Sequence, residues 1–223
     1  MSFMEPVVEQ DSYTGVAEQA FRRFRVNPRG ELVVPDWMTQ LAMDGRVFNA
    51  SNPVQETNQD ISTTARGTDN VSPALLLDVP ASTVAFPLYI MLMPISQTTD
   101  EAVTVSINTD DGVRYSSGGQ AVTPLNMRKD DPVTSACSFY NGSTAITAIA
   151  NVDDDTIWAA LIPAGDVPAV SGTRLPLIWT AKEAIPPMLV GPASMLIFVT
   201  SATADTLFRW SVQWAEFSTS LFT

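Results

Sequence analysis

The chain has 223 residues, of which 45% are hydrophobic and only 16% charged, and 24 acidic against 12 basic side chains give it a net charge of -12. That length fits one large domain, or one domain with an extension. The negative charge repels phosphate and anionic lipid, which argues against direct binding of nucleic acid or of a membrane surface.

The first part of the chain, residues 1–71, is predicted to be an N-terminal arm with short helical turns, because it holds few apolar runs and many polar residues. It does not begin with a basic segment followed by a long apolar one, so no signal peptide is expected. A short helix is predicted over residues 16–24, with Phe21 and Phe24 on one face. A short strand is predicted over residues 31–34.

The end of the arm carries a helix start signal. Asp36 is a favoured N-cap residue, and it predicts a helical turn that passes through Trp37 and Leu41 and ends near Gly45. Residues 49–71 show no clear period and are expected to be extended or irregular.

The remainder, residues 72–223, is predicted to be a single β domain. Strands are expected at 75–79, 84–93, 101–107, 113–116, 122–127, 134–140, 144–151, 156–162, 175–180, 195–201 and 207–217. In the last of these, one face carries Phe208, Trp210, Val212, Trp214 and Glu216. No long helical period separates the strands, so the fold class is all-β, an antiparallel β-sandwich of jelly-roll type.

Turn signals separate the predicted strands. They lie at Asp110 to Gly112, Ser117 to Gly119, Lys129 to Pro132, Asn141-Gly142 and Asp153 to Asp155. Aspartate is favoured in turns because its side chain bonds the local backbone, and this is our interpretation of the acidic pairs. Two alternatives remain for these carboxylates: a calcium site at 153–155, and the acid pair of a glycosidase.

The chain contains no histidine, and Cys137 is its single cysteine. Imidazole-based triads, imidazole metal sites and an internal disulfide are therefore excluded. Cys137 is expected to be a small core residue on a strand. We predict no catalytic residue, no cofactor and no metal site, and hence no enzyme.

The arm carries candidates for a subunit interface. Arginines alternating with phenylalanines suit either stacking on nucleic acid or contact with an acidic patch of a protein, and the acidity of the whole chain favours the protein. Tryptophan and leucine at the helical turn are further anchors. The predicted interface residues are Phe21, Arg22, Arg23, Phe24, Arg25, Trp37 and Leu41.

Four segments carry a resemblance to viral proteins. The stretch from Ile185 to Ser201 and the terminal Trp210-Ser-Val-Gln-Trp214 resemble the closing strands of jelly-roll virion proteins. Arg29 to Trp37 and Leu41 to Phe48 resemble structural proteins of tailed-phage-like viruses. The resemblance implies a β-sandwich subunit in or on a capsid, often trimeric around a local three-fold axis.

The resemblance sets the expected function. It implies a capsid decoration or cement protein of the virion that binds the major capsid protein or other virion subunits through its arm, as a homotrimer. The acidic charge of the chain departs from coat proteins that neutralise a genome with basic arms, which argues against an inner-shell role. The alternatives are a jelly-roll coat protein that forms the shell, and a receptor-binding or lectin-like fibre or spike module that binds a host glycan.

Overall fold

The computed structural model describes residues 36–52, 71–97, 102–130, 132–150, 155–164, 176–201 and 206–221. These residues form twelve strands, one α-helix and a short 3-10 helix at Thr219–Leu221. The helix predicted over 16–24, the strand predicted over 31–34 and the interface candidates from Phe21 to Arg25 lie outside the described residues.

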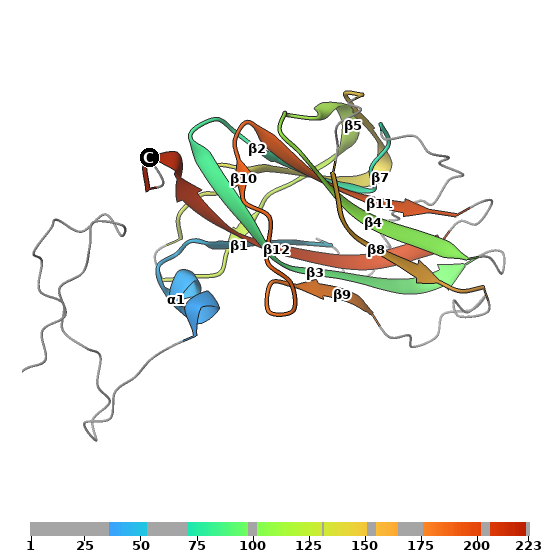
Figure 1. Cartoon of the computed structure of the whole chain (residues 1–223), viewed down its shortest axis with the longest axis horizontal. Coiled ribbons are helices and arrows are strands. Elements are labelled where there is room, and N and C mark those ends of the chain that lie inside the picture. Colours follow the sequence, from blue (N-terminus) through green and yellow to red (C-terminus); the bar gives the residue numbers. More distant parts are fainter. Residues whose placement is uncertain are drawn as a thin grey trace, which may run out of the picture.

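The strands form two sheets of six that face each other (Figure 1). Every pairing between the strands is antiparallel. The first sheet contains β1 (Val47–Ser51), β3 (Thr83–Gln97), β6 (Leu125–Asn126), β9 (Leu177–Thr180), β10 (Leu189–Val190) and β12 (Thr206–Ser218). The second contains β2 (Leu75–Val79), β4 (Val103–Asp110), β5 (Tyr115–Val122), β7 (Ser138–Ala148), β8 (Asp155–Ile162) and β11 (Ala193–Thr200).

The chain crosses repeatedly from one sheet to the other. The order β1-β12-β3-β9 runs through the first sheet, and the order β2-β11-β4-β8 runs through the second. This is the connectivity of an eight-stranded jelly roll, to which β10 is a short addition and β5, β6 and β7 are an insertion between β4 and β8. The predicted antiparallel, jelly-roll-like fold is confirmed.

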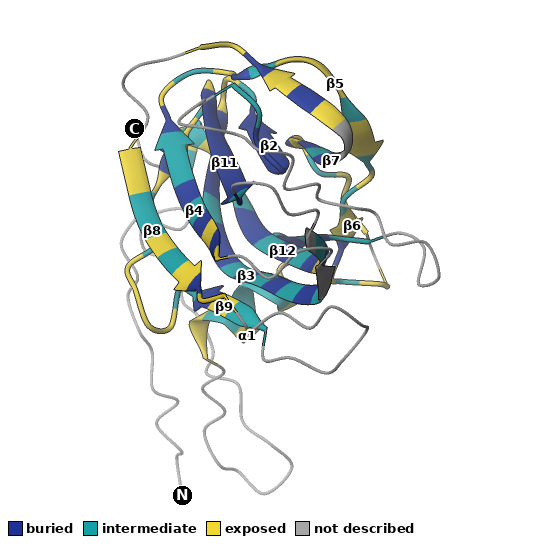
Figure 2. Cartoon of the chain, turned by 90° about the vertical axis from the view of Figure 1, so that its right-hand side faces the viewer, coloured by how far each residue is buried: buried dark blue, intermediate teal, exposed yellow. Residues whose placement is uncertain are grey.

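The core lies between the two sheets and is formed chiefly by alternate residues of β2, β4, β11 and β12 (Figure 2). On β12 the predicted alternation holds, since Phe208, Trp210 and Trp214 are at most 2% exposed. The ring of Phe139 lies 5.3 Å from that of Trp210 and 5.7 Å from that of Trp214, measured between centroids. These aromatic contacts join β7 of the second sheet to β12 of the first.

Two elements that precede residue 72 belong to the sandwich. β1 lies between β12 and β6, and its Phe48 and Ala50 enter the core. α1 (Trp37–Met43) lies on the outer face of the first sheet, against Val47, Leu88 and Ala215. The predicted boundary at residue 72 therefore leaves out two elements of the sandwich, α1 and β1. The sequence does not predict β1 because five residues with Asn and Ser carry little apolar signal.

A turn predicted at Asn141-Gly142 is instead the middle of β7. The first half of this strand, up to Asn141, lies between β2 and β5, and its second half, Ile146 to Ala148, pairs with β5 alone. The N–H of Gly142 donates to the carbonyl oxygen of Ala74 at 2.8 Å, and a Cβ at this position would lie 2.8 Å from the same oxygen. The glycine therefore serves a close backbone approach where the pairing of β7 with β2 ends, and not a hairpin.

The turn predicted at Ser117 to Gly119 also proves to be strand. Gly118 and Gly119 lie within β5, with φ of +75° and +65°, and the register against β7 shifts at this point. Glycine is needed because both residues adopt left-handed backbone conformations within a bulged strand. The insertion then covers part of the outer face of the second sheet, where Tyr115 and Tyr140 pack against Leu76.

Candidate functional site

α1 begins at the predicted cap. The carboxylate of Asp36 accepts hydrogen bonds from the backbone N–H of Met38 at 2.9 Å and from the hydroxyl of Thr39 at 2.6 Å. The Thr39 hydroxyl holds the pKa of Asp36 below its usual value. The helix ends before Gly45, whose φ is +70°, so both predicted ends of this helix are confirmed.

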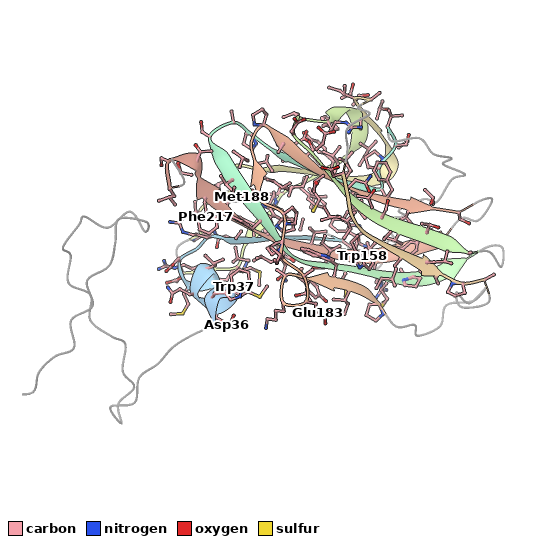
Figure 3. All side chains as sticks on the ribbon, in the orientation of Figure 1. Asp36, Trp37, Trp158, Glu183, Met188 and Phe217 are labelled. Atoms are coloured by element: carbon pink, nitrogen blue, oxygen red, sulfur yellow. The ribbon has the colours of Figure 1, made fainter. Side chains whose placement is uncertain are left out.

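Two predicted interface residues lie on this helix. Trp37 is in its first turn and is 49% exposed (Figure 3). Leu41 is partly buried and packs on the apolar cluster beneath the helix. About half of Trp37 is therefore open to a partner, directly after residues 1–35, while Leu41 holds α1 on the first sheet.

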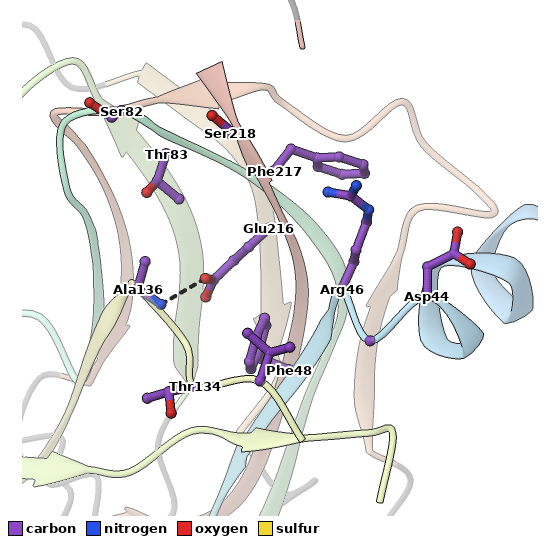
Figure 4. Close-up of a pocket in the computed structure, with 12 residues that line it drawn as sticks. Asp44, Arg46, Phe48, Ser82, Thr83, Thr134, Ala136, Glu216, Phe217 and Ser218 are labelled. Atoms are coloured by element: carbon purple, nitrogen blue, oxygen red, sulfur yellow. Dashed lines mark hydrogen bonds between the residues drawn. The ribbon is translucent and has the colours of Figure 1, made fainter. Parts of the chain in front are cut away.

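A pocket of about 410 Å³ opens beside the end of β12, between Arg46, Thr83 and Glu216 (Figure 4). The guanidinium of Arg46 lies 4.8 Å from the centre of the Phe217 ring, which is a cation–π contact. Arg46 is the basic side chain of this pocket.

The carboxylate of Glu216 is fully engaged inside the molecule. It accepts hydrogen bonds from the backbone N–H of Ala136 at 2.8 Å, from the indole N–H of Trp214 at 2.7 Å and from the hydroxyl of Ser135. These donors use both carboxylate oxygens. Glu216 therefore ties the segment before β7 to β12, which is a structural task.

Cys137 lies next to this carboxylate and is buried in the core. Burial raises the pKa of its thiol, and the negative charge of Glu216 raises it further. A protonated thiol is a poor nucleophile and a poor metal ligand. The predicted core role of Cys137 is confirmed, although the residue lies just before β7 and not on a strand.

A second pocket, of about 340 Å³, lies beside β10 and is lined by Asp110, Asp111 and Asp155, among others. Asp110 accepts a hydrogen bond from the N–H of Gly112 at 2.9 Å, as the turn predicted there requires. Within the described ranges, no three Asp, Glu, His or Cys side chains are grouped as metal ligands. Residues 153 and 154, which belong to the calcium alternative, lie outside those ranges.

A buried polar network joins the turn after β4 to the outer face of the second sheet. Arg114 is 2% exposed, and its Nη1 donates to Asp110 Oδ2 at 2.5 Å while its Nε donates to the carbonyl oxygen of Ile149. The carboxylate of Asp78 accepts hydrogen bonds from the Ser194 hydroxyl and from the backbone N–H groups of Arg114 and Tyr115, both at 3.2 Å.

Burial raises the pKa of Asp78, and its hydrogen bonds and the charge of Arg114 oppose that effect. Asp78 is 7% exposed and Ser194 is fully buried, and neither residue lines the pockets at Glu216 and Asp111. A serine hydroxyl beside a carboxylate is thus closed to substrate in this fold, and the network acts as a clamp between β2, β11 and the turn. One feature of the sequence indicates this network: Asp78 lies within the apolar run Leu75–Val79, where a buried carboxylate needs polar partners.

No protein-family model, curated protein or solved structure matches this chain. Among the described residues, none of the helices has the length and apolar character needed to span a membrane.

Proposed function

We propose that this chain is a structural subunit of a virus particle, a capsid-associated decoration or cement protein that binds neighbouring subunits through its N-terminal arm. The observation that carries the proposal is a jelly roll with a half-exposed tryptophan, Trp37, where residues 1–35 join the domain. The jelly roll is a recurrent architecture of viral capsid domains. The acidic charge of the chain suits a place on the particle surface, away from the genome.

The proposed function is binding, in which a few large side chains of the arm supply most of the interface energy. Tryptophan and arginine are the side chains that most often dominate the energy of protein interfaces. Trp37 supplies an aromatic anchor on a rigid helix, since α1 is capped by Asp36 and packed on the first sheet. Phe21, Phe24 and the arginines between residues 22 and 25 extend the same contact along the arm to virion subunits or to further copies in a homotrimer.

The direct test is cryo-electron microscopy of particles of the virus that encodes this chain. We expect density for the jelly roll of residues 36–221 on or within the capsid, with the N-terminal segment continuing onto a neighbouring subunit. The proposal is wrong if purified particles contain no such domain, or if the chain is found only in infected cells.

A variant series tests the arm on the same particles. Particles stripped of the protein are incubated with the full chain, with Trp37→Ala or with the chain shortened to residues 36–223, and bound protein is measured. We expect Trp37→Ala to weaken binding about tenfold or more and the deletion to abolish it. Val113→Ala, at a position 43% exposed on the turn after β4, is the matched control and should bind as wild type.

The deletion must stop at residue 35. β1 pairs with both β12 and β6, so removing residues 1–52 would also remove a core strand and would test folding instead of binding. Circular dichroism of each variant establishes that the sandwich is intact before binding is measured. Unchanged binding by a folded chain of residues 36–223 would show that the arm has no part in attachment.

A further inference from the structure

Four places on the sandwich present a strand edge without a second partner among the described residues, and three of them are short or irregular. β6 and β10 are two residues long, and β9, on the same side of β3 as β10, has four. β5 is interrupted by two left-handed glycines and two register shifts. Short and bulged strands are the usual means by which proteins prevent edge-to-edge pairing.

β8 has eight residues and lacks this protection along most of its length. It pairs with β4 on one side, and the other side lies at the margin of the second sheet (Figure 2). From Thr156 to Ile162 the strand has no charged residue and no proline, and Asp155 at its start is its one charge. Leu161 is 62% exposed, the most exposed of the large hydrophobic side chains on a strand.

The part of β8 suited to further pairing is sharply limited. Its register with β4 is regular from Trp158 to Ile162, and a bulge interrupts the pairing beyond Trp158, at Ile157. Pro163 follows directly and cannot donate a backbone hydrogen bond. Five regular residues therefore remain, with Ala160 at their centre.

This five-residue segment is complementary to itself. In an antiparallel pair related by a two-fold axis at Ala160, Ala159 of one copy faces Leu161 of the other, so a small side chain meets a large one on the outer face. Across from Ala159 and Leu161, β4 presents Ser106 and Thr104, which are also uncharged. These four outward-facing side chains are thus uncharged, in a chain whose net charge is -12.

We propose that β8 is a homotypic contact, in which the second sheets of two copies pair edge to edge through Trp158–Ile162 about Ala160. The two-fold arrangement keeps both copies of Asp155 about 34 Å apart along the strands, so the charge on β8 does not oppose it. Each contact adds a short ladder of main-chain hydrogen bonds, which suits a weak interaction repeated within an assembly. This contact deepens the proposed function by naming a partner surface, and it is distinct from the arm.

Disulfide trapping of the full chain tests the register. Ala159→Cys and Leu161→Cys are made separately, mixed in equal amounts and oxidised. We expect a covalent dimer from the mixture, because opposing residues in a ladder bring their Cα atoms within about 5.5 Å, whereas each variant meets its own copy two residues away, at about 7 Å. The wild-type chain is the background control, since Cys137 is buried. A mixture that gives no more dimer than the separate variants would contradict this register.

Sedimentation equilibrium tests the contact without oxidation. We expect the full chain to associate with rising concentration, and Leu161→Lys to weaken this association at least tenfold, since it places a desolvated charge at the edge. Leu125→Lys, at a position 55% exposed on β6, should associate as wild type. A chain that stays monomeric at millimolar concentration, or a Leu161→Lys variant that associates normally, would refute the β8 contact. Neither outcome affects the particle test of the arm.

Discussion

Arg114 and Asp110 form an ion pair that solvent does not reach, since their side chains are 2% and 0% exposed. A buried pair gains little over an apolar pair of the same shape, because both charges lose their hydration. Losing one partner is costly, since the other charge is then buried alone. The pair therefore acts as a constraint on the turn between β4 and β5, which it holds against the carbonyl of Ile149.

Arg114→Met should lower the free energy of unfolding by about 3–5 kcal/mol, because it leaves the carboxylate of Asp110 buried without its cation. Arg128→Met is the matched control, since Arg128 pairs with Asp130 at 2.9 Å on the surface, where the side chains are 36% and 74% exposed. We expect that control to cost less than about 1 kcal/mol. Urea unfolding of both variants measures the difference, and equal losses would show that the burial of the Arg114 pair is unimportant.

Asp78 gives the chain a distinctive dependence on pH. Its folded pKa is raised, chiefly by burial, so the folded state holds the proton more tightly than the unfolded state does. The contribution of Asp78 to stability therefore falls as pH rises from the unfolded pKa, near 3.8, through the raised folded value. We expect the free energy of unfolding of wild type, relative to Asp78→Asn, to decline over that window and then level off.

Urea unfolding in steps from about pH 3.5 to about pH 8 measures this decline. Asp36→Asn supplies a control of opposite sign. The folded pKa of Asp36 is lowered by Thr39, so its contribution is present above the unfolded pKa and is lost as pH falls through the folded value. If the wild type instead gained stability over Asp78→Asn with rising pH, the hydrogen bonds to Asp78 would outweigh its burial.

At the scale of single strands, β5 requires glycine at position 118. Gly118 on β5 has φ of +75°, and a Cβ there would lie 2.1 Å from the carbonyl oxygen of Ala145 on β7. This glycine makes the bulge that lets the insertion curve over the outer face of the second sheet. The neighbouring pairs of β5 and β7 depend on it.

Gly118→Ala should therefore reduce the free energy of unfolding by about 1–3 kcal/mol, through steric overlap and backbone strain. Gly112→Ala is the control, because a Cβ there has no neighbour closer than 3.5 Å. We expect it to cost less than about 1 kcal/mol. Thermal unfolding followed by circular dichroism compares the two variants. Equal melting temperatures would show that the bulge of β5 does not require glycine at position 118.

Apart from β1, the strands of the jelly roll proper could be predicted from sequence with some accuracy, because alternating apolar residues or apolar runs flanked by turn residues define them. β2 has its predicted bounds, and β12 differs by one residue at each end. The insertion could not be predicted in this way. Asn141-Gly142 and Gly118-Gly119 have the composition of turns, and only contacts far along the chain, with Ala74 and Ala145, show that they lie inside strands.

Candidate sites were less predictable than strands. Turn residues such as Asp110 and the cap Asp36 act locally, so a sequence pattern suffices for them. The network of Asp78, Ser194 and Arg114 joins residues up to 116 positions apart, which no local pattern can predict. The exposed edge of β8 depends on the strand order of the whole sheet, and so it too emerges only from the fold.

Across the whole molecule, the proposed contacts lie on different elements. Trp37 is on α1, which covers the outer face of the first sheet, whereas β8 forms the margin of the second (Figure 1). One subunit can therefore use both contacts at the same time. Two independent contacts of this kind are sufficient to connect subunits into an extended lattice, in which weak individual interactions add up.

The order of strands also governs when the protein can fold. β11 and β12 follow the other described strands in the sequence and occupy central places in the two sheets: β11 lies between β2 and β4, and β12 lies between β1 and β3. Until they leave the ribosome, each sheet consists of two separated parts with unpaired inner edges. Folding of the sandwich is therefore expected to be slow and to wait until β11 and β12 have been synthesised.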